Sequence, residues 1–301
     1  MIDNKEKFLE LRNKYKNFIY DSYKIYEDKE SINIEYRFEI PDLKVFKPTL
    51  KILKKNLIVN KIEDNKEYIN NLVFHIGLIE LISYWKSVCS PNVIIKCGYI
   101  NEEQINWFKK LYFYGLGELF FTNNIKTNIN EFMNIICEGE KIDIQSGAKQ
   151  YEFNNYIIPI GGGKDSVVTL ELLNEMNNNL ALIINPKPVT LECAKIAGIK
   201  DDNIIEIKRT IDKELLDLNA KGYINGHTPF SSMLAFLSYF ISDLIGTKYI
   251  ALSNESSANE SNVVGEKINH QYSKSVEFEN DFRYYAKKYL KRNTEYFSFL
   301  R

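Results

Sequence analysis

The chain has 301 residues, of which 45 % are hydrophobic and 26 % are charged, and this is the composition of a globular protein with a sizeable core. Because 39 lysines and arginines nearly balance 40 aspartates and glutamates, the net charge of −1 provides no global field that would attract nucleic acid. The first residues are polar, and the most apolar stretch, Met233 to Gly246, is too short and too polar to span a bilayer, so we expect a cytoplasmic protein without a membrane or nucleic-acid partner.

The first half of the chain predicts a mixed α+β region, which we expect to form a smaller N-terminal domain over residues 1–150. A polar helix is expected from about Lys5 to Asn17, and the alternation of apolar and polar residues over 31–38 is typical of a strand. Apolar spacing predicts a helix over about 64–88, followed by a strand at 93–95. Asn101 is expected to cap a further helix that ends near Gly115.

The second half, residues 151–301, shows a more regular alternation. Strands are predicted at 157–160, 180–184, 204–208 and 249–252, and the helices between them end near Asn177 or span about 190–197 and 229–245. This alternation predicts an α/β fold with a doubly wound parallel sheet. Such sheets bind ligands at the carboxyl ends of their strands, where three polar segments follow: 161–166, 185–188 and 253–262.

A glycine run joins the first of these strands to its helix: Gly161-Gly162-Gly163-Lys164-Asp165-Ser166. Strand, glycine turn and helix form a phosphate-binding site, because bare backbone N–H groups and the helix dipole attract an anion. Lys164 adds a positive charge, and Ser166 adds a hydroxyl donor. The spacing matches neither G-x-x-x-x-G-K-[ST] nor G-x-G-x-x-G. The alternative interpretation is an ordinary tight turn between a strand and a helix.

A second cluster is Asn225-Gly226-His227-Thr228-Pro229. We expect Thr228 to cap a helix whose first residue is Pro229, which would create another anion site. His227 is a candidate for donating to a phosphate or for transferring a proton. A plain helix cap with an exposed histidine is an equally good interpretation of this motif alone.

The polar segment Ser253 to Asn262 follows the last predicted strand of the second half. Glu255 or Glu260 could hold Mg²⁺, which prefers oxygen ligands together with the phosphates of ATP. Asn254 and Asn185, at the ends of two strands, are candidate nucleotide-binding residues. Without the preceding strand, a solvated polar loop would be the favoured interpretation.

The segment 268–279 is the third cluster. If it is helical, His270, Lys274 and Glu277 share one face, and an imidazole, an amine and an acid on one face suit proton transfer. A surface helix held by salt bridges is the alternative.

These segments together resemble a known family. The glycine run is similar to the pyrophosphate loop S-G-G-x-D-S of the N-type ATP pyrophosphatases (PP-loop proteins), with Gly161 in place of the serine. The wider pattern resembles the ATP-dependent UDP-N-acetylmuramoyl-L-alanyl-L-glutamate epimerases of bacterial peptidoglycan (cell wall) synthesis. The similar segments are 74–80, 115–118, 159–166, 225–227, 253–255, 269–275 and 277–279.

The resemblance implies an enzyme that uses ATP and Mg²⁺, adenylates the terminal glutamate carboxylate with release of pyrophosphate and then AMP, and inverts the α carbon. It implies that the backbone of 161–163, with Lys164 and Ser166, holds pyrophosphate, and that Asp165 acts through Mg²⁺ with Glu255 or Glu260. His227, His270, Lys274 and Glu277 are its unranked acid/base or carboxylate-positioning candidates.

Two other functions remain open. One is another adenylating enzyme, either a thiolase or an amide-forming synthetase, although the four cysteines form none of the C-x-x-C pairs that a thiolase usually needs. The other is a non-catalytic ATP-binding subunit. The resemblance also implies a further, cysteine-containing C-terminal segment after Arg301, which leads us to expect a partner chain, a shortened family branch or a truncated sequence.

Overall fold

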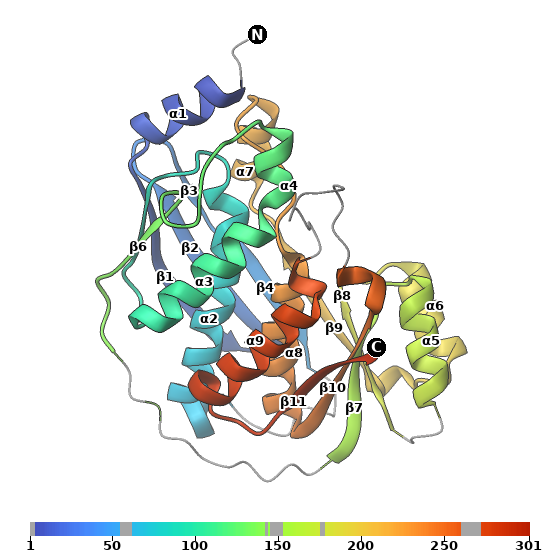
Figure 1. The fold of residues 1–301 in the computed structure, drawn as a ribbon. Helices are drawn as coiled ribbons and strands as arrows, with labels where there is room; N and C mark the ends of the chain where they lie inside the picture. The colour runs from blue at the N-terminus through green and yellow to red at the C-terminus, as the bar shows by residue number, and fades with distance from the viewer. Residues whose placement is uncertain (1–3, 55–61, 142–143, 145–152, 175–177, 260–271) are drawn as a thin grey trace.

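One mixed sheet forms the centre of the molecule (Figure 1). The computed structural model describes residues 4–54, 62–141, 144, 153–174, 178–259 and 272–301. Within these residues the sheet has 11 strands in the order β11-β10-β7-β8-β9-β4-β2-β1-β5-β6, with β3 paired to β2. The strands are β1 Asn17–Glu27, β2 Ser31–Ile40, β3 Lys44–Phe46, β4 Thr49–Leu53, β5 Asn92–Ile95, β6 Asn134–Cys137, β7 Phe153–Pro159, β8 Leu180–Ile184, β9 Ile204–Thr210, β10 Thr247–Glu255 and β11 Glu295–Leu300.

The helices pack on this sheet from both sides. They are α1 Asn4–Lys14, α2 Lys66–Trp85, α3 Glu102–Gly115, α4 Gly117–Thr122, α5 Lys164–Leu173, α6 Pro188–Ile196, α7 Lys213–Ala220, α8 Phe230–Ile245 and α9 Val276–Tyr285. The predicted α/β class is confirmed. The doubly wound PP-loop class and the smaller N-terminal domain stay predictions.

Strands from both halves of the chain belong to the same sheet. Strands β7 to β11 pair with one another in parallel, whereas β4 pairs with β9 in antiparallel fashion, from Thr49 opposite Thr210 to Ile52 opposite Ile207. Backbone hydrogen bonds therefore join the first half of the chain to the second. The division into units 1–150 and 151–301 stays a prediction.

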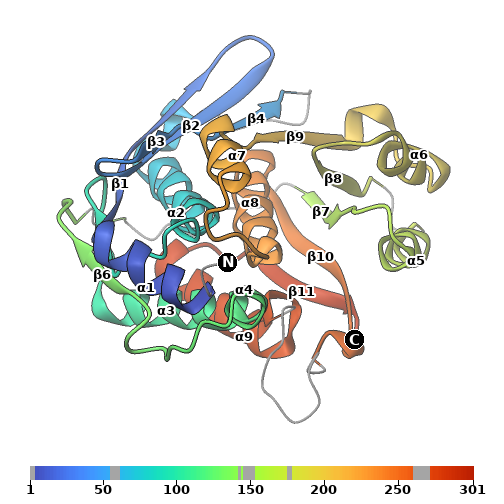
Figure 2. The same ribbon diagram turned by 90° about the horizontal axis from the view of Figure 1, so that it is seen from above.

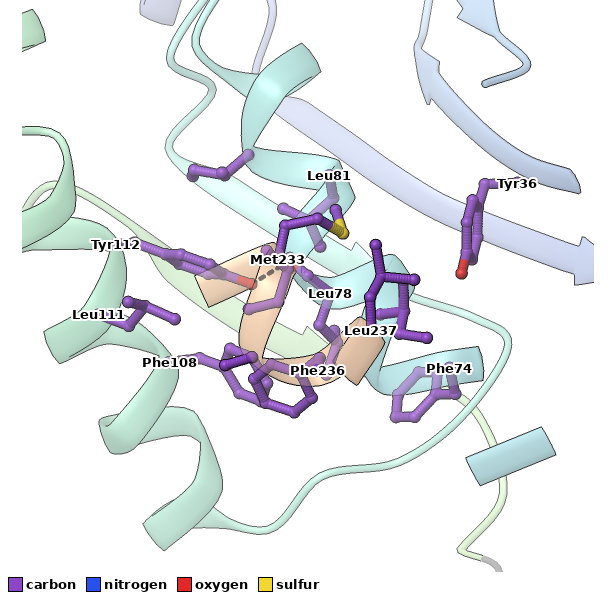
Figure 3. Close-up of a cluster of buried hydrophobic side chains, with 14 of the residues drawn as sticks. Tyr36, Phe74, Leu78, Leu81, Phe108, Leu111, Tyr112, Met233, Phe236 and Leu237 are labelled. Atoms are coloured by element: carbon purple, nitrogen blue, oxygen red, sulfur yellow. Dashed lines mark hydrogen bonds between the residues drawn. The ribbon is translucent and has the colours of Figure 1, made fainter. Parts of the chain in front are cut away.

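The larger hydrophobic core lies between the sheet and helices α2, α3 and α8 (Figure 3). Phe108 of α3 and Phe236 of α8 stack with ring centroids 6.2 Å apart. The buried Tyr112 hydroxyl donates to the carbonyl of Leu78 at 2.5 Å, so α3 is also tied to α2 by a hydrogen bond. The apolar stretch after Pro229 is the buried helix α8, as predicted. Among the described residues, no helix has both the length and the apolar character needed to cross a membrane.

The central parts of strands β7, β8 and β10 are buried on both faces. Ile157, Leu182 and Ile250 belong to the larger core, whereas their neighbours Ile158, Ala181 and Ala251 belong to a second core with α5 and α6. Figure 2 shows α8 on one side of β7 and β8 and α5 with α6 on the other. Because successive side chains in a strand point to opposite faces, a continuous apolar run such as 180–184 can fill both cores.

Two local predictions are wrong. Helix α8 begins at Phe230 after Pro229, and no side chain caps it, so Thr228 does not have the capping role that its residue type suggested. The segment before α9 is not a continuous helix, because residues 272–274 form a 3₁₀ turn and Ser275 is an extended N-cap. Lys274 and Glu277 therefore do not share a helical face.

Candidate functional site

The glycine run forms an open backbone turn between β7 and α5. Gly162 has φ of 80°, a left-handed conformation that favours glycine, and Gly163 is the N-cap of the ten-residue helix α5. A Cβ atom added at Gly161 or Gly163 would meet nothing within 4 Å. Within the described residues, the amide N–H groups of all three glycines have no hydrogen-bond acceptor. This arrangement of unpaired donors at a helix N-terminus fits a phosphate group.

Lys164 links the glycine run to the end of β10. Its Nζ lies 2.6 Å from Asp165 Oδ1 and 3.1 Å from Glu255 Oε1, and its side chain is 77 % exposed. Hydrogen bonds to Asp165 and then to Glu255 raise the pKa of Lys164. The structure thus brings together three of the predicted residues, one of which is about ninety positions away in the chain.

The same carboxylates fit a magnesium ion in part. Mg²⁺ is usually bound through one or two carboxylates together with substrate phosphates, and Asp165 and Glu255 provide oxygen donors beside the glycine run. No group of three or more histidine, cysteine, aspartate or glutamate side chains suited to a metal occurs in the described part of the chain. The predicted ligand Glu260 lies outside the described residues.

Ser166 is buried, and its hydroxyl donates to the carbonyl of Gly163 at 2.9 Å. In this structure the hydroxyl therefore closes the first turn of α5. The predicted contact of Ser166 with pyrophosphate stays a prediction.

Asn185, directly after β8, is held by β9. Its backbone has φ of 52°, its N–H donates to the carbonyl of Ile207 at 2.7 Å, and its Oδ1 accepts from the N–H of Arg209 at 2.8 Å. These bonds fix the start of the segment that leads from β8 to α6. In α6, Thr190 Cγ2 would lie 3.1 Å from a Cβ atom on Gly162. Asn185 consequently lies at the carboxyl edge of the sheet, and its role in nucleotide binding stays a prediction.

Arg209 makes a buried ion pair that the sequence analysis missed. Its Nε lies 2.8 Å from Glu80 Oε2, its Nη2 lies 2.9 Å from Glu80 Oε1, and Nη2 also donates to Ser83 Oγ at 3.2 Å. Burial disfavours the charged guanidinium, but the Glu80 carboxylate outweighs this effect and raises the pKa of Arg209. The alternation of β9 could have indicated this residue, since Ile205 and Ile207 on the same face are buried.

Asn254 belongs to a chain of hydrogen bonds at the ends of β10 and β11. Its Nδ2 donates to Ser298 Oγ at 3.2 Å, and Ser298 Oγ donates to Glu279 Oε2 at 2.5 Å. Arg301 Nη1 donates to the same carboxylate at 2.8 Å and Nη2 to the carbonyl of Lys274. The backbone of Lys274 is therefore tied to the carboxyl edge of β11, although its side chain is exposed.

The acid/base candidates within the described residues lie in separate segments. Glu277 forms an ion pair with Lys110 of α3 at 2.7 Å, beside Asp281. His227 is exposed and lies in the segment that leads to the N-terminus of α8, and His270 lies outside the described residues. Their proposed chemical roles stay predictions.

Lys86, at the end of α2, contacts the segment that contains His227. Its Nζ donates to the carbonyl of Gly226 at 2.6 Å, and burial, followed by the nearby charge of Arg209, lowers the pKa of Lys86 to about 8. A lysine with a lowered pKa is a candidate functional group. Nothing in the local sequence pattern distinguishes Lys86 from the other lysines.

Comparison with known proteins gives consistent matches. A family model described as the MurL N-terminal domain matches residues 10–299. Three curated relatives share the name UDP-N-acetyl-alpha-D-muramoyl-L-alanyl-L-glutamate epimerase. The protein from Xanthomonas oryzae pv. oryzae is 28 % identical over 74 % of this chain and 49 % of its own length. The one from Micromonospora is 30 % identical over 73 % and 48 %, and the one from Salinispora tropica is 38 % identical over 47 % and 31 %.

This chain therefore spans at most about half the length of those relatives. A solved multidomain structure of a keto acid-selecting NRPS module aligns with 80 % of this chain and 26 % of its own, at 10 % identity and a TM-score of 0.30. That structural match is too weak to inform either fold or function.

Proposed function

Since the chain belongs to the MurL N-terminal domain family, we propose that it contains the ATP-cleaving site of an epimerase. The substrate is UDP-N-acetylmuramoyl-L-alanyl-L-glutamate, the compound in the relatives' names. The observation that carries the proposal is the open glycine turn whose Lys164 also contacts Glu255. These features support a doubly wound PP-loop unit. The proposal further includes a cytoplasmic location and a partner chain that supplies sequence found in the relatives beyond their match.

The α-hydrogen of the substrate's glutamate is difficult to remove. Removing the α-hydrogen of a free glutamate would place a carbanion beside a carboxylate. If a carboxylate oxygen attacks the α-phosphorus of ATP, the bond to the bridging oxygen of the β-phosphate breaks and pyrophosphate leaves. The resulting acyl adenylate has lost the carboxylate charge, so a base can remove the α-proton. Reprotonation from the opposite face inverts the centre, and water then releases AMP and the free acid.

The residues of this chain have distinct parts in the proposal. The amides of 161–163 and the ammonium of Lys164 hold the departing pyrophosphate, where negative charge develops. Asp165 and Glu255 would hold Mg²⁺, which neutralises phosphate charge when it is bound. His227, His270, Lys274 and Glu277 are the candidates for proton transfer.

Replacement of Lys164 tests this assignment. The variant Lys164→Met is expected to lose about 10²- to 10³-fold in pyrophosphate release with ATP and the nucleotide-peptide, as when one donor to developing charge is removed. Its melting temperature should stay near that of the parent, because an exposed ion pair contributes little to stability. Lys200→Gln, which changes an exposed lysine before β9, is the matched control.

Retained pyrophosphate release in Lys164→Met would contradict the proposal. If the parent chain binds ATP in calorimetry but releases no pyrophosphate with this substrate, it is an ATP-binding unit instead. Pyrophosphate release with a different carboxylate would indicate another adenylating enzyme.

A further inference from the structure

A cavity of about 750 Å³ lies beside the carboxyl ends of β8 and β9, and the reaction described above does not use it. Its walls come from β4, from β9 and from the segment that follows β8. The residues that line it include Lys51, Leu53, Asn185, Lys208, Thr210 and Ile211.

The alternation of the two strands shows which face of the sheet the cavity occupies. In β9, Ile207 is buried in the larger core and Arg209 turns to Glu80 of α2, so Lys208 and Thr210 point to the opposite face. In β4, Leu50 and Ile52 are buried, which places Lys51 on that same opposite face. The cavity is therefore separated from α2 by the sheet.

Two lysines occupy opposite positions on the paired strands β4 and β9 at this cavity. Lys51 lies directly opposite Lys208 in the antiparallel register of β4 and β9. Like charges in this relation are destabilising. Among the described residues, neither ammonium has an ion-pair or hydrogen-bond partner. An anion placed between them would relieve this repulsion.

Neutral donors complete the lining. Because Asn185 Oδ1 accepts from the N–H of Arg209, its Nδ2 is left as a donor without a partner in the described chain. The Thr210 hydroxyl is likewise without a partner there. Leu53 and Ile211 add apolar surface, and Glu206 is the sole carboxylate among the described residues that line the cavity.

The position of the cavity relates it to the glycine run. Strand β8 separates β7 from β9, and β4 follows β9, so neighbouring strands place the lysines roughly 10 to 15 Å from the glycine run. We propose that this cavity binds an anionic group, phosphate or carboxylate, of the acceptor substrate, at a distance from the carboxylate that reacts. This inference rests on the proposed function and adds the place where the substrate is recognised.

Binding of substrate fragments tests the inference. UDP and L-alanyl-L-glutamate are titrated separately into the parent chain, into the double variant Lys51→Gln/Lys208→Gln, and into Lys200→Gln, and each dissociation constant is measured by calorimetry. Lys200 precedes the opposite end of β9 and is also exposed, so its variant is a matched control for lost charge. Loss of two charged donors should weaken binding of the recognised fragment by about 100-fold.

Weakened binding of UDP alone identifies the diphosphate as the anion, and weakened binding of the dipeptide alone identifies a carboxylate. If the double variant binds both fragments like the parent, or if the parent binds neither at millimolar concentration, the inference is overturned. The affinity for ATP must stay unchanged, because a parallel loss would assign the lysines to the nucleotide. If the parent chain binds a fragment, the double variant binds it more weakly, and the parent releases no pyrophosphate, the proposed function is refuted while this cavity assignment stays in place.

Discussion

Removal of one partner from the buried ion pair between Glu80 and Arg209 should be one of the most destabilising single substitutions in the molecule. The Glu80 side chain is 1 % exposed and that of Arg209 is 10 % exposed. The variant Glu80→Gln keeps the side-chain volume but turns an NH₂ group, in place of an oxygen, toward the guanidinium. Two charge-assisted hydrogen bonds of 2.8 and 2.9 Å are weakened or lost, and the buried positive charge remains.

The magnitude follows from these contacts. A hydrogen bond to a charged group contributes about 1.5–3 kcal/mol, so two of them give about 3–6 kcal/mol. This range overlaps the loss of about 3–5 kcal/mol that accompanies removal of one partner from a buried pair. We therefore expect Glu80→Gln to lower the free energy of unfolding by about 4 kcal/mol.

Urea denaturation followed by circular dichroism measures this loss, with the m value as a check that the unfolding transition is unchanged. The double variant Glu80→Leu/Arg209→Met should recover most of the loss, because it leaves no buried charge. A loss below about 1 kcal/mol for Glu80→Gln would show that the buried charge is compensated in some other way.

Two further predictions concern the glycine run and a buried histidine. Gly162→Ala should lower the free energy of unfolding by about 1–2 kcal/mol, because its φ is 80° and a Cβ atom would lie 3.1 Å from Thr190 Cγ2. Gly163 has φ of −91° and open space around its Cβ position, so Gly163→Ala should keep the free energy of unfolding of the parent. Calorimetry should show that Gly163→Ala loses ATP affinity. Equal losses of stability in the two glycine variants would refute this reasoning. Burial lowers the pKa of His75 to about 4. Because the unfolded chain binds a proton near pH 6.5 and the folded chain does not, stability should fall by about 3 kcal/mol as the pH drops from above 6.5 toward 4. Urea titrations at pH 7.5 and 4.5 should show a smaller change in His75→Gln, and an identical change in both proteins would exclude this histidine as the cause.

The parallel half of the fold was predictable because several of its strands contain continuous apolar runs. The segments 180–184, 204–208 and 249–252 lie within strands, and 157–160 overlaps β7, which ends at Pro159. Burial on both faces explains the apolar runs 180–184 and 249–252, whereas Glu206 and Lys208 interrupt 204–208. The capping box of α3, in which Asn101 accepts from the N–H of Gln104, confirms the predicted cap. In contrast, β1 was missed because tyrosine, lysine and aspartate interrupt its apolar residues, and only its first positions are fully buried.

The site was predictable where local sequence determines backbone shape. The contiguous glycines anticipated the turn, and the sequence analysis placed Glu255 at the carboxyl end of a strand, the edge at which it contacts Lys164. The pairing of Lys51 with Lys208 depends on the antiparallel contact between β4 and β9, which joins positions about 157 residues apart and leaves no trace in either segment. The missed pair of Glu80 with Arg209 likewise joins distant positions, 129 residues apart, in α2 and β9.

The junction between β4 and β9 also makes the molecule mechanically stiff. A hinge motion of one half against the other would have to break the backbone ladder from Thr49 to Ile52, so we expect the two halves to move together. We then expect the distance between Lys51 and the glycine run to stay nearly constant. If the cavity binds a distant anion of the substrate as proposed, we expect substrates to be selected by the length between that anion and the reacting carboxylate.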